Sequence, residues 1–156
     1  MALQVWLPLD GNLNNLGLNT MTFSALNGTS GLTTNTAGKI GSCIARTSST
    51  TSRYRSSTTI DLNGDISMAC WLYVDAMTDT SAQGVITNHS HESCTGVGLT
   101  LKQISSTDCR LSCNTGIGSD RTYNFYYGTK NILGAWHHVG LTYNKTKKVL
   151  QLWVDG

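Results

Sequence analysis

Hydrophobic residues along this chain recur at every second position, or run together over short stretches. Clusters of glycine, asparagine, serine and threonine separate these stretches. A period of two is typical of β-strands, whereas an amphipathic helix repeats its apolar positions at intervals of three and four residues. No segment of convincing length shows the helical spacing. The pattern therefore predicts an all-β chain with many turns.

The alternation predicts about ten or eleven short strands, which is the number and spacing that a sandwich or jelly roll needs. We expect strands at residues 3–9, 21–26, 39–45, 52–60, 66–75, 83–88, 97–104, 108–114, 122–127, 136–143 and 148–154. The segments 13–18, 29–37 and 128–134 are predicted to be connections. No internal repeat is visible, so these strands belong to a non-repetitive architecture.

The segment 66–75 gives the strongest strand pattern. One set of alternate positions is apolar throughout, and the other set contains Ala69, Trp71 and Tyr73. Apolar residues on both faces predict a central strand that is covered on both sides. We therefore expect Trp71, together with Trp136 from a later strand, to pack as core wedges between two sheets.

The composition excludes several classes of protein. Charged residues make up 13% of the chain, the net charge is +2 and hydrophobic residues reach 39%, which argues against disorder. The one local basic cluster, Lys145 to Lys148, falls on an expected hairpin turn, so we expect no nucleic-acid partner. No apolar run approaches the length that spans a bilayer.

The N-terminus and the cysteines bear on the compartment. Residues 1–6 lack the basic region, apolar region and cleavage site of a secretion signal, so we expect synthesis in the cytoplasm. An odd number of cysteines argues against a disulfide framework, and buried free thiols are the simpler interpretation. A Cys94–Cys109 disulfide is the alternative if the protein reaches an oxidising environment.

Four stretches in order carry a family resemblance: VWLPLDGN (5–12), GKIGSCI (38–44), DISMACWLYV (65–74), and WHHVGLTY (136–143) followed by LQLWVDG (150–156). Together they resemble the laminin G-like domains of the concanavalin A-like lectin and glucanase superfamily. The resemblance implies an antiparallel two-sheet β-sandwich of the jelly-roll type, as one domain over residues 1–156. Members of this family continue past a turn such as the one at 155–156. We therefore expect the chain to lack its C-terminal strands.

The resemblance includes glucanases, which need two carboxylates that act as acid and nucleophile. In the hydrolases that the chain resembles, these carboxylates alternate on one strand. No strand here carries such a set, and the only glutamate, Glu92, falls in an expected loop. A serine nucleophile elbow is also missing. We therefore expect no enzyme activity, and a glycoside hydrolase is the weakest of three functional hypotheses.

The first functional hypothesis is a non-catalytic module that binds carbohydrate or another cell-surface polymer. Sugar sites combine aromatic planes with amides, guanidinium groups and other polar side chains. We expect Tyr123, Phe125 and Tyr127 to pack the core, and of His137 and His138 we expect one to be hydrogen-bonded and the other to lie on an open face. The candidate carbohydrate-binding residues are His89, His91, Arg121, Asn124, Tyr126 and His138.

Two metal hypotheses remain beside this one, and no other cofactor is expected. The resemblance places a calcium loop at Asp10 and Asn12, where the alternative is an Asx-turn at a strand end. A zinc site is a second pattern, although solvent histidines beside buried thiols are the simpler interpretation. Its candidate ligands are His89, His91, Cys94, Cys109 and Cys113.

The second functional hypothesis is a structural or adhesive virion protein. Laminin G-like domains that start at residue one without a signal resemble those encoded in bacteriophage structural regions. Such a protein decorates a head or tail, lies at the virion surface and contacts other virion proteins. The two hypotheses overlap, because a virion surface protein can also bind host glycans.

Overall fold

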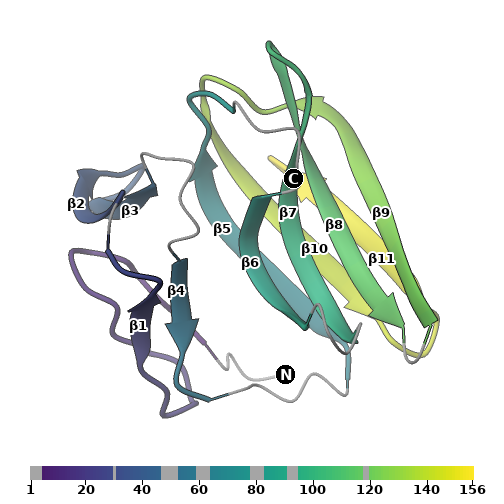
Figure 1. Ribbon diagram of the computed structural model, residues 1–156, viewed down its shortest axis with the longest axis horizontal. Coiled ribbons are helices and arrows are strands. Elements are labelled where there is room, and N and C mark those ends of the chain that lie inside the picture. Colours follow the sequence, from purple (N-terminus) through teal and green to yellow (C-terminus); the bar gives the residue numbers. More distant parts are fainter. Residues whose placement is uncertain are drawn as a thin grey trace. The chain divides into compact units, whose positions relative to one another are not determined.

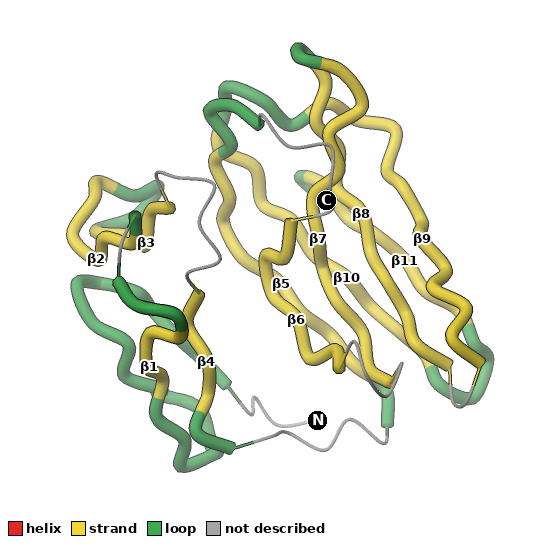
Figure 2. The backbone as a smooth tube through the Cα atoms, in the orientation of Figure 1, coloured by secondary structure: helices red, strands yellow, loops and turns green. Residues whose placement is uncertain are grey.

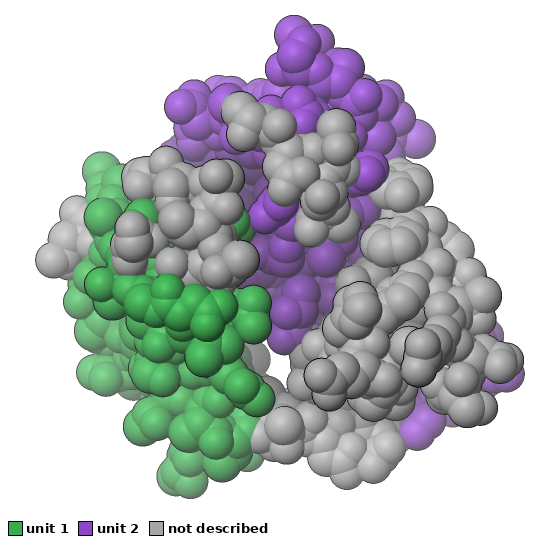
Figure 3. Space-filling model, viewed as in Figure 1, with its two compact units in different colours: residues 1–59 green, residues 60–156 purple. Residues whose placement is uncertain are grey.

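The structure is a computed structural model that describes residues 5–29, 31–46, 53–58, 64–77, 83–90, 95–117 and 120–156. Within these ranges every regular element is a β-strand (Figure 2), which confirms the predicted all-β class. None of the described residues forms a helix long and apolar enough to cross a membrane. The chain divides into two compact units, residues 1–59 and 60–156 (Figure 3). A single domain over the whole chain stays a prediction.

The first unit contains two antiparallel strand pairs. Strand β1 (Phe23–Leu26) pairs with β4 (Arg53–Ser56), and β2 (Leu32–Ala37) pairs with β3 (Ser42–Arg46). Strand β2 lies within the segment that the sequence predicted as a polar connection, and that prediction is wrong. The threonines of this segment are β-branched, and their preference for extended backbone outweighs the lack of apolar alternation.

The predicted first strand is also wrong over residues 5–9, which form no strand. Pro8 has no backbone N–H to donate to a ladder, and Leu9 has a φ of 65°, which interrupts an extended chain. The Trp6 backbone N–H donates instead to Asn15 Oδ1 at 2.8 Å. The Trp6 side chain is 53% exposed, so it does not anchor a core.

The second unit contains two antiparallel sheets (Figure 1). The three-stranded sheet has the order β11 (Val149–Val154), β10 (Trp136–Asn144), β5 (Ile66–Tyr73). The four-stranded sheet has the order β6 (Gln83–Ser90), β7 (Thr95–Ser105), β8 (Asp108–Ile117), β9 (Asp120–Asn131). The predicted strands of this unit are confirmed, but β9 continues through residues 128–131, which were predicted to be a connection.

The two sheets of the second unit share one hydrophobic core. Val139 and Leu141 of the three-stranded sheet and Leu99, Leu111 and Cys113 of the four-stranded sheet belong to a single cluster of buried residues. Two antiparallel sheets that enclose one core form a β-sandwich. The predicted fold class is therefore confirmed.

Asn131 fixes the chain where it leaves β9. Its side-chain oxygen accepts hydrogen bonds from the backbone N–H groups of Cys109 (3.0 Å) and Leu133 (3.2 Å). Its side-chain nitrogen donates to the Thr107 carbonyl at 2.8 Å. One amide therefore ties the β7–β8 turn to the segment that leads into β10, and so to the start of the three-stranded sheet.

Asp155 fixes the end of β11 against the start of β10. Its backbone N–H donates to the His138 carbonyl (2.8 Å), and its carboxylate accepts from the His138 N–H (3.0 Å), His137 Nδ1 (2.7 Å) and Lys130 Nζ (2.6 Å). The hydrogen bond from Lys130, followed by the one from His137, holds the pKa of the Asp155 carboxyl well below its usual range. The ionised carboxylate therefore stabilises this corner of the sheet.

The described part of the four-stranded sheet buries a polar pair. Thr100 of β7 lies opposite Ser112 of β8, and their hydroxyl oxygens are 2.7 Å apart. Both residues are buried. Each hydroxyl therefore satisfies the other where water does not reach.

Removing one member of this pair is expected to cost more than removing both. Ser112→Ala leaves the Thr100 hydroxyl buried without this partner, and we expect the free energy of unfolding to fall by about 1–3 kcal/mol. The double variant Thr100→Val/Ser112→Ala should recover most of that loss. Urea unfolding followed by circular dichroism measures both values, and a double variant that loses the sum of the two single losses would contradict the pairing.

The Asp155 carboxylate is expected to contribute to the acid limb of stability. Its pKa in the folded chain is lower than that of an unfolded aspartate, about 3.9, so its contribution is present above that pH and is lost as the pH falls further. We expect Asp155→Asn to lower Tm near neutral pH and to shrink the drop in Tm on acidification. Lys130→Met should reproduce part of this flattening. An unchanged acid limb in both variants would refute the assignment.

Candidate functional site

The outer face of the three-stranded sheet carries a group of aromatic side chains. In the register, Tyr73 of β5 lies opposite Trp136 of β10, and Trp71 lies opposite His138. Trp153 of β11 lies opposite Gly140. Residues directly opposite each other in an antiparallel pair share a face, and so do alternate residues of one strand. We call Trp71, Tyr73, Trp136, His138 and Trp153 the aromatic face.

The aromatic face is exposed, whereas the alternate positions of the same strands face the core. Trp71 and Tyr73 are each 43% exposed, and Trp153 is 44% exposed. His138 is also exposed, and Trp136 is half-buried. Trp71 is therefore not the core wedge that the sequence predicted, and the prediction that this strand is covered on both sides is wrong. Each residue of the aromatic face lies opposite another outward residue on the neighbouring strand.

Cross-strand contacts hold four of these rings in pairs. The ring centroids of Trp71 and His138 are 5.3 Å apart with an interplanar angle of 53°, and those of Tyr73 and Trp136 are 5.6 Å apart at 52°. Tilted pairs at these separations are favourable, because the edge of one ring is attracted to the face of the other. The rings are therefore arranged before any ligand binds.

The Trp153 side chain contacts the central strand, β10. Its indole Nε1 donates to the Thr142 hydroxyl at 3.3 Å, on the strand next to its own. Gly140, directly opposite Trp153, carries no side chain, which leaves room for the indole to extend over β10. A Cβ at Gly140 would also lie 3.1 Å from the Met68 carbonyl oxygen, so the backbone there is closely packed.

The outward positions of β5 and β10 carry no formal charge between the Ser67–Thr142 row and the Tyr73–Trp136 row. Asp155, just beyond the end of β11, lies opposite His138, and its charge is paired with that of Lys130. Ser67 and Gln151 are exposed, and they add a hydroxyl and an amide to the rings. The arrangement offers aromatic planes for stacking and neutral groups for hydrogen bonds. It offers no pair of carboxylates for glycoside hydrolysis.

The two neighbouring histidines divide as the sequence predicted. The His137 side chain is 12% exposed and is hydrogen-bonded to Asp155, whereas His138 lies on the exposed aromatic face. The sequence analysis did not predict Trp71, Tyr73 or Trp153 as binding residues. Their alternation with core residues was visible, and the polar residues Ser67, Thr142 and Gln151 that share their face were the signal that this face is open.

The remaining predicted carbohydrate-binding residues lie where their side chains are not described. His89 is in β6, and Arg121, Asn124 and Tyr126 are in β9. His91 lies outside the described residues. The backbone register pairs Tyr126 with Cys113 and Phe125 with Asn114. Carbohydrate binding by these five candidates stays a prediction.

Asn12 forms a local turn, whereas Asp10 contacts a distant segment of the chain. The Asp10 carboxylate accepts from the Ser42 N–H at 3.1 Å, and the Asn12 side-chain oxygen accepts from the Asn14 N–H at 2.9 Å. The Asn12 amide also donates to the Asp10 carbonyl at 3.2 Å. The bond from the Asn14 N–H to Asn12 fits the Asx-turn that was the alternative at this position. Calcium binding at Asp10 and Asn12 stays a prediction. No group of three or more His, Cys, Asp or Glu residues gathers in the described ranges.

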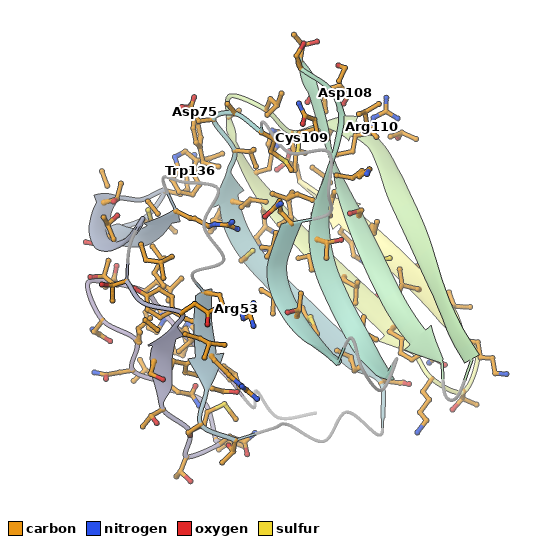
Figure 4. All side chains as sticks on the ribbon, viewed as in Figure 1. Arg53, Asp75, Asp108, Cys109, Arg110 and Trp136 are labelled. Carbon is orange, nitrogen blue, oxygen red and sulfur yellow. The ribbon has the colours of Figure 1, made fainter. Side chains whose placement is uncertain are left out.

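The described cysteines, which are Cys43, Cys70, Cys109 and Cys113, are thiols that form no disulfide. Cys109 and Cys113 are buried. Burial, with a smaller effect from the nearby Asp108 carboxylate, raises the pKa of the Cys109 thiol to about 11, and Asp108 itself pairs with Arg110 at 2.7 Å (Figure 4). Burial also raises the pKa of Cys70 to about 11. Zinc binds the thiolate, so these shifts disfavour Cys109 as a ligand. Cys94, its predicted partner, lies outside the described residues.

The comparison with protein families gives one match. The family of laminin G domains of type 3, which is described as the concanavalin A-like lectin/glucanases superfamily, matches residues 47–156. No curated protein and no solved structure matched the chain. The match covers more than half of the sequence and includes every strand of the sandwich. The chain therefore belongs to the concanavalin A-like lectin/glucanase superfamily, as a laminin G-like protein.

Proposed function

We propose that the chain is a non-catalytic binding module that recognises carbohydrate through the aromatic face. The observation that carries this proposal is the exposure of Trp71, Tyr73 and Trp153 together on one outward face of the sandwich. Single exposed apolar residues are ordinary on protein surfaces, whereas large apolar side chains gathered on one face mark an interaction site.

Carbohydrate suits this surface for a physical reason. A sugar ring presents C–H groups on its flat sides and hydroxyls around its rim. The flat sides pack against aromatic planes, and the hydroxyls bond to neutral polar groups such as those of Ser67 and Gln151. Membership of a family described by its lectins and glucanases supports this choice. The family alone does not decide function, because one fold serves many sites.

A binding role without catalysis is also part of the proposal. Hydrolysis of a glycosidic bond needs an acid and a nucleophile or base at a fixed separation. Between Ser67 and Tyr73, the outward positions of β5 and those opposite them on β10 bear hydroxyl, imidazole and aromatic groups. The Asp155 carboxylate, next to His138, is occupied by hydrogen bonds from Lys130, His137 and the His138 N–H. Binding at this face would therefore hold a glycan without cleaving it.

We expect Trp153→Ala to lower the affinity for the best glycan ligand about tenfold or more, because it removes one stacking plane and its buried area. A glycan array read with calcium and with a chelator would find the ligand, and titration calorimetry would then measure it. Trp6→Ala is the matched control, since it removes an exposed tryptophan from the first unit. It should leave affinity unchanged.

Two results would overturn the proposal. Silence on the array in both conditions would favour the structural virion protein that the sequence also suggested. An equal loss in Trp6→Ala and Trp153→Ala would show that binding does not use the aromatic face. Loss of binding in chelator alone would support the calcium hypothesis at Asp10 and Asn12.

A further inference from the structure

The aromatic face has an extent that can be calculated from the register. Tyr73 and Trp136 form one row across the sheet, Trp71 and His138 form the next, and Trp153 lies in the third. Outward residues of one strand repeat every two positions, so neighbouring rows are about 6.7 Å apart. Three rows therefore extend about 13 Å along the strands.

The rows are also displaced sideways. The first row lies on β5 and β10, and Trp153 of the third row lies on β11, at the other side of the sheet. Adjacent strands are about 4.8 Å apart, so the rings form an oblique band about 16 Å long across three strands. A band of this length exceeds one sugar ring and matches a chain of several.

The charge of the band restricts the ligand further. Sulfated and acidic glycans are held by arginine or lysine, which form short charge-assisted hydrogen bonds. The outward positions from Ser67 to Tyr73, and those opposite them, include neither. Lys130, a cation in the described part of this corner, is paired with Asp155 at 2.6 Å. Placing an anionic sugar against these indoles would cost desolvation with no counter-charge to offset it.

We infer that the aromatic face binds an extended, uncharged polysaccharide as a chain across several rings. This inference rests on the proposed carbohydrate function and adds the class of ligand. Sugars with equatorial hydroxyls fit best, since both sides of such a ring are flat and apolar. The tilted pairs Trp71–His138 and Tyr73–Trp136 and the separate indole of Trp153 then contact successive units of the chain.

Two matched comparisons test the inference on the full chain. The first comparison uses neutral hydroxyethyl cellulose and acidic carboxymethyl cellulose, which share a backbone and differ in charge. The second uses neutral galactomannan and acidic polygalacturonate. We expect the neutral member of each pair to bind at least tenfold more tightly in affinity electrophoresis at low salt. In titrations with β-linked oligosaccharides from glucose to cellohexaose, or the manno-series if galactomannan binds better, affinity should rise with length.

Variants along the band distinguish a chain from a single sugar. Tyr73→Ala and Trp153→Ala lie at its two ends, so each should weaken the hexaose several-fold, and no more than one should weaken the disaccharide. Trp6→Ala is again the control, and thermal unfolding checks that each variant is folded. Tighter binding of the acidic polymers, or an affinity that is already complete with one sugar, would overturn the inference while leaving carbohydrate binding intact. Failure to bind any glycan would overturn both proposals.

Discussion

The register between β5 and β10 is the constraint on which the rest of this structure depends. It places Val139 opposite Cys70 on the core side and His138 opposite Trp71 on the outer side. A slip of one residue would send every side chain to the other face, exposing Val139 and Leu141. Burial of such residues stabilises the fold by roughly 1.5–3 kcal/mol each. The same interaction that builds the core therefore also decides which rings face outward.

Much of the second unit could be predicted from the sequence, because apolar residues at every second position identify its strands. The residues of β5 taken alone did not decide which of its faces is covered, and the polar residues on the same face of β10 and β11 become a signal only once the pairing is known. Both sets of alternate positions are apolar, so Trp71 and Tyr73 looked as suitable for burial as Met68 and Leu72. The answer depends on the side from which the second sheet packs, and that is a tertiary property. In the first unit, the positive φ of Leu9 interrupts the strand that the sequence predicted over residues 3–9.

The candidate site shows the same division between local and tertiary information. The sequence predicted that one of two adjacent histidines is hydrogen-bonded and the other open, and the bond from His137 to Asp155 shows which is which. The Asp10 carboxylate accepts from the Ser42 N–H, 32 residues away in the chain, and the sequence did not predict this contact. Trp153 was visible in the sequence, yet its reach across β10 depends on a glycine in a different strand. Only pairing in space brings these two residues together.

Stability and binding are divided between the two faces of the same strands, and this division makes the proposed binding role accessible to mutation. Core residues such as Leu141 are fully buried, whereas the outward rings are only partly buried. The two cross-strand ring pairs add about 0.5–1.5 kcal/mol each. An outward ring can therefore be truncated at a modest cost in stability. Folding buries the exposed rings only in part, since more than two-fifths of Trp71 and Trp153 stays in water. The apolar area left there becomes favourable only when another molecule covers it, which is the physical reason to assign the aromatic face to a ligand.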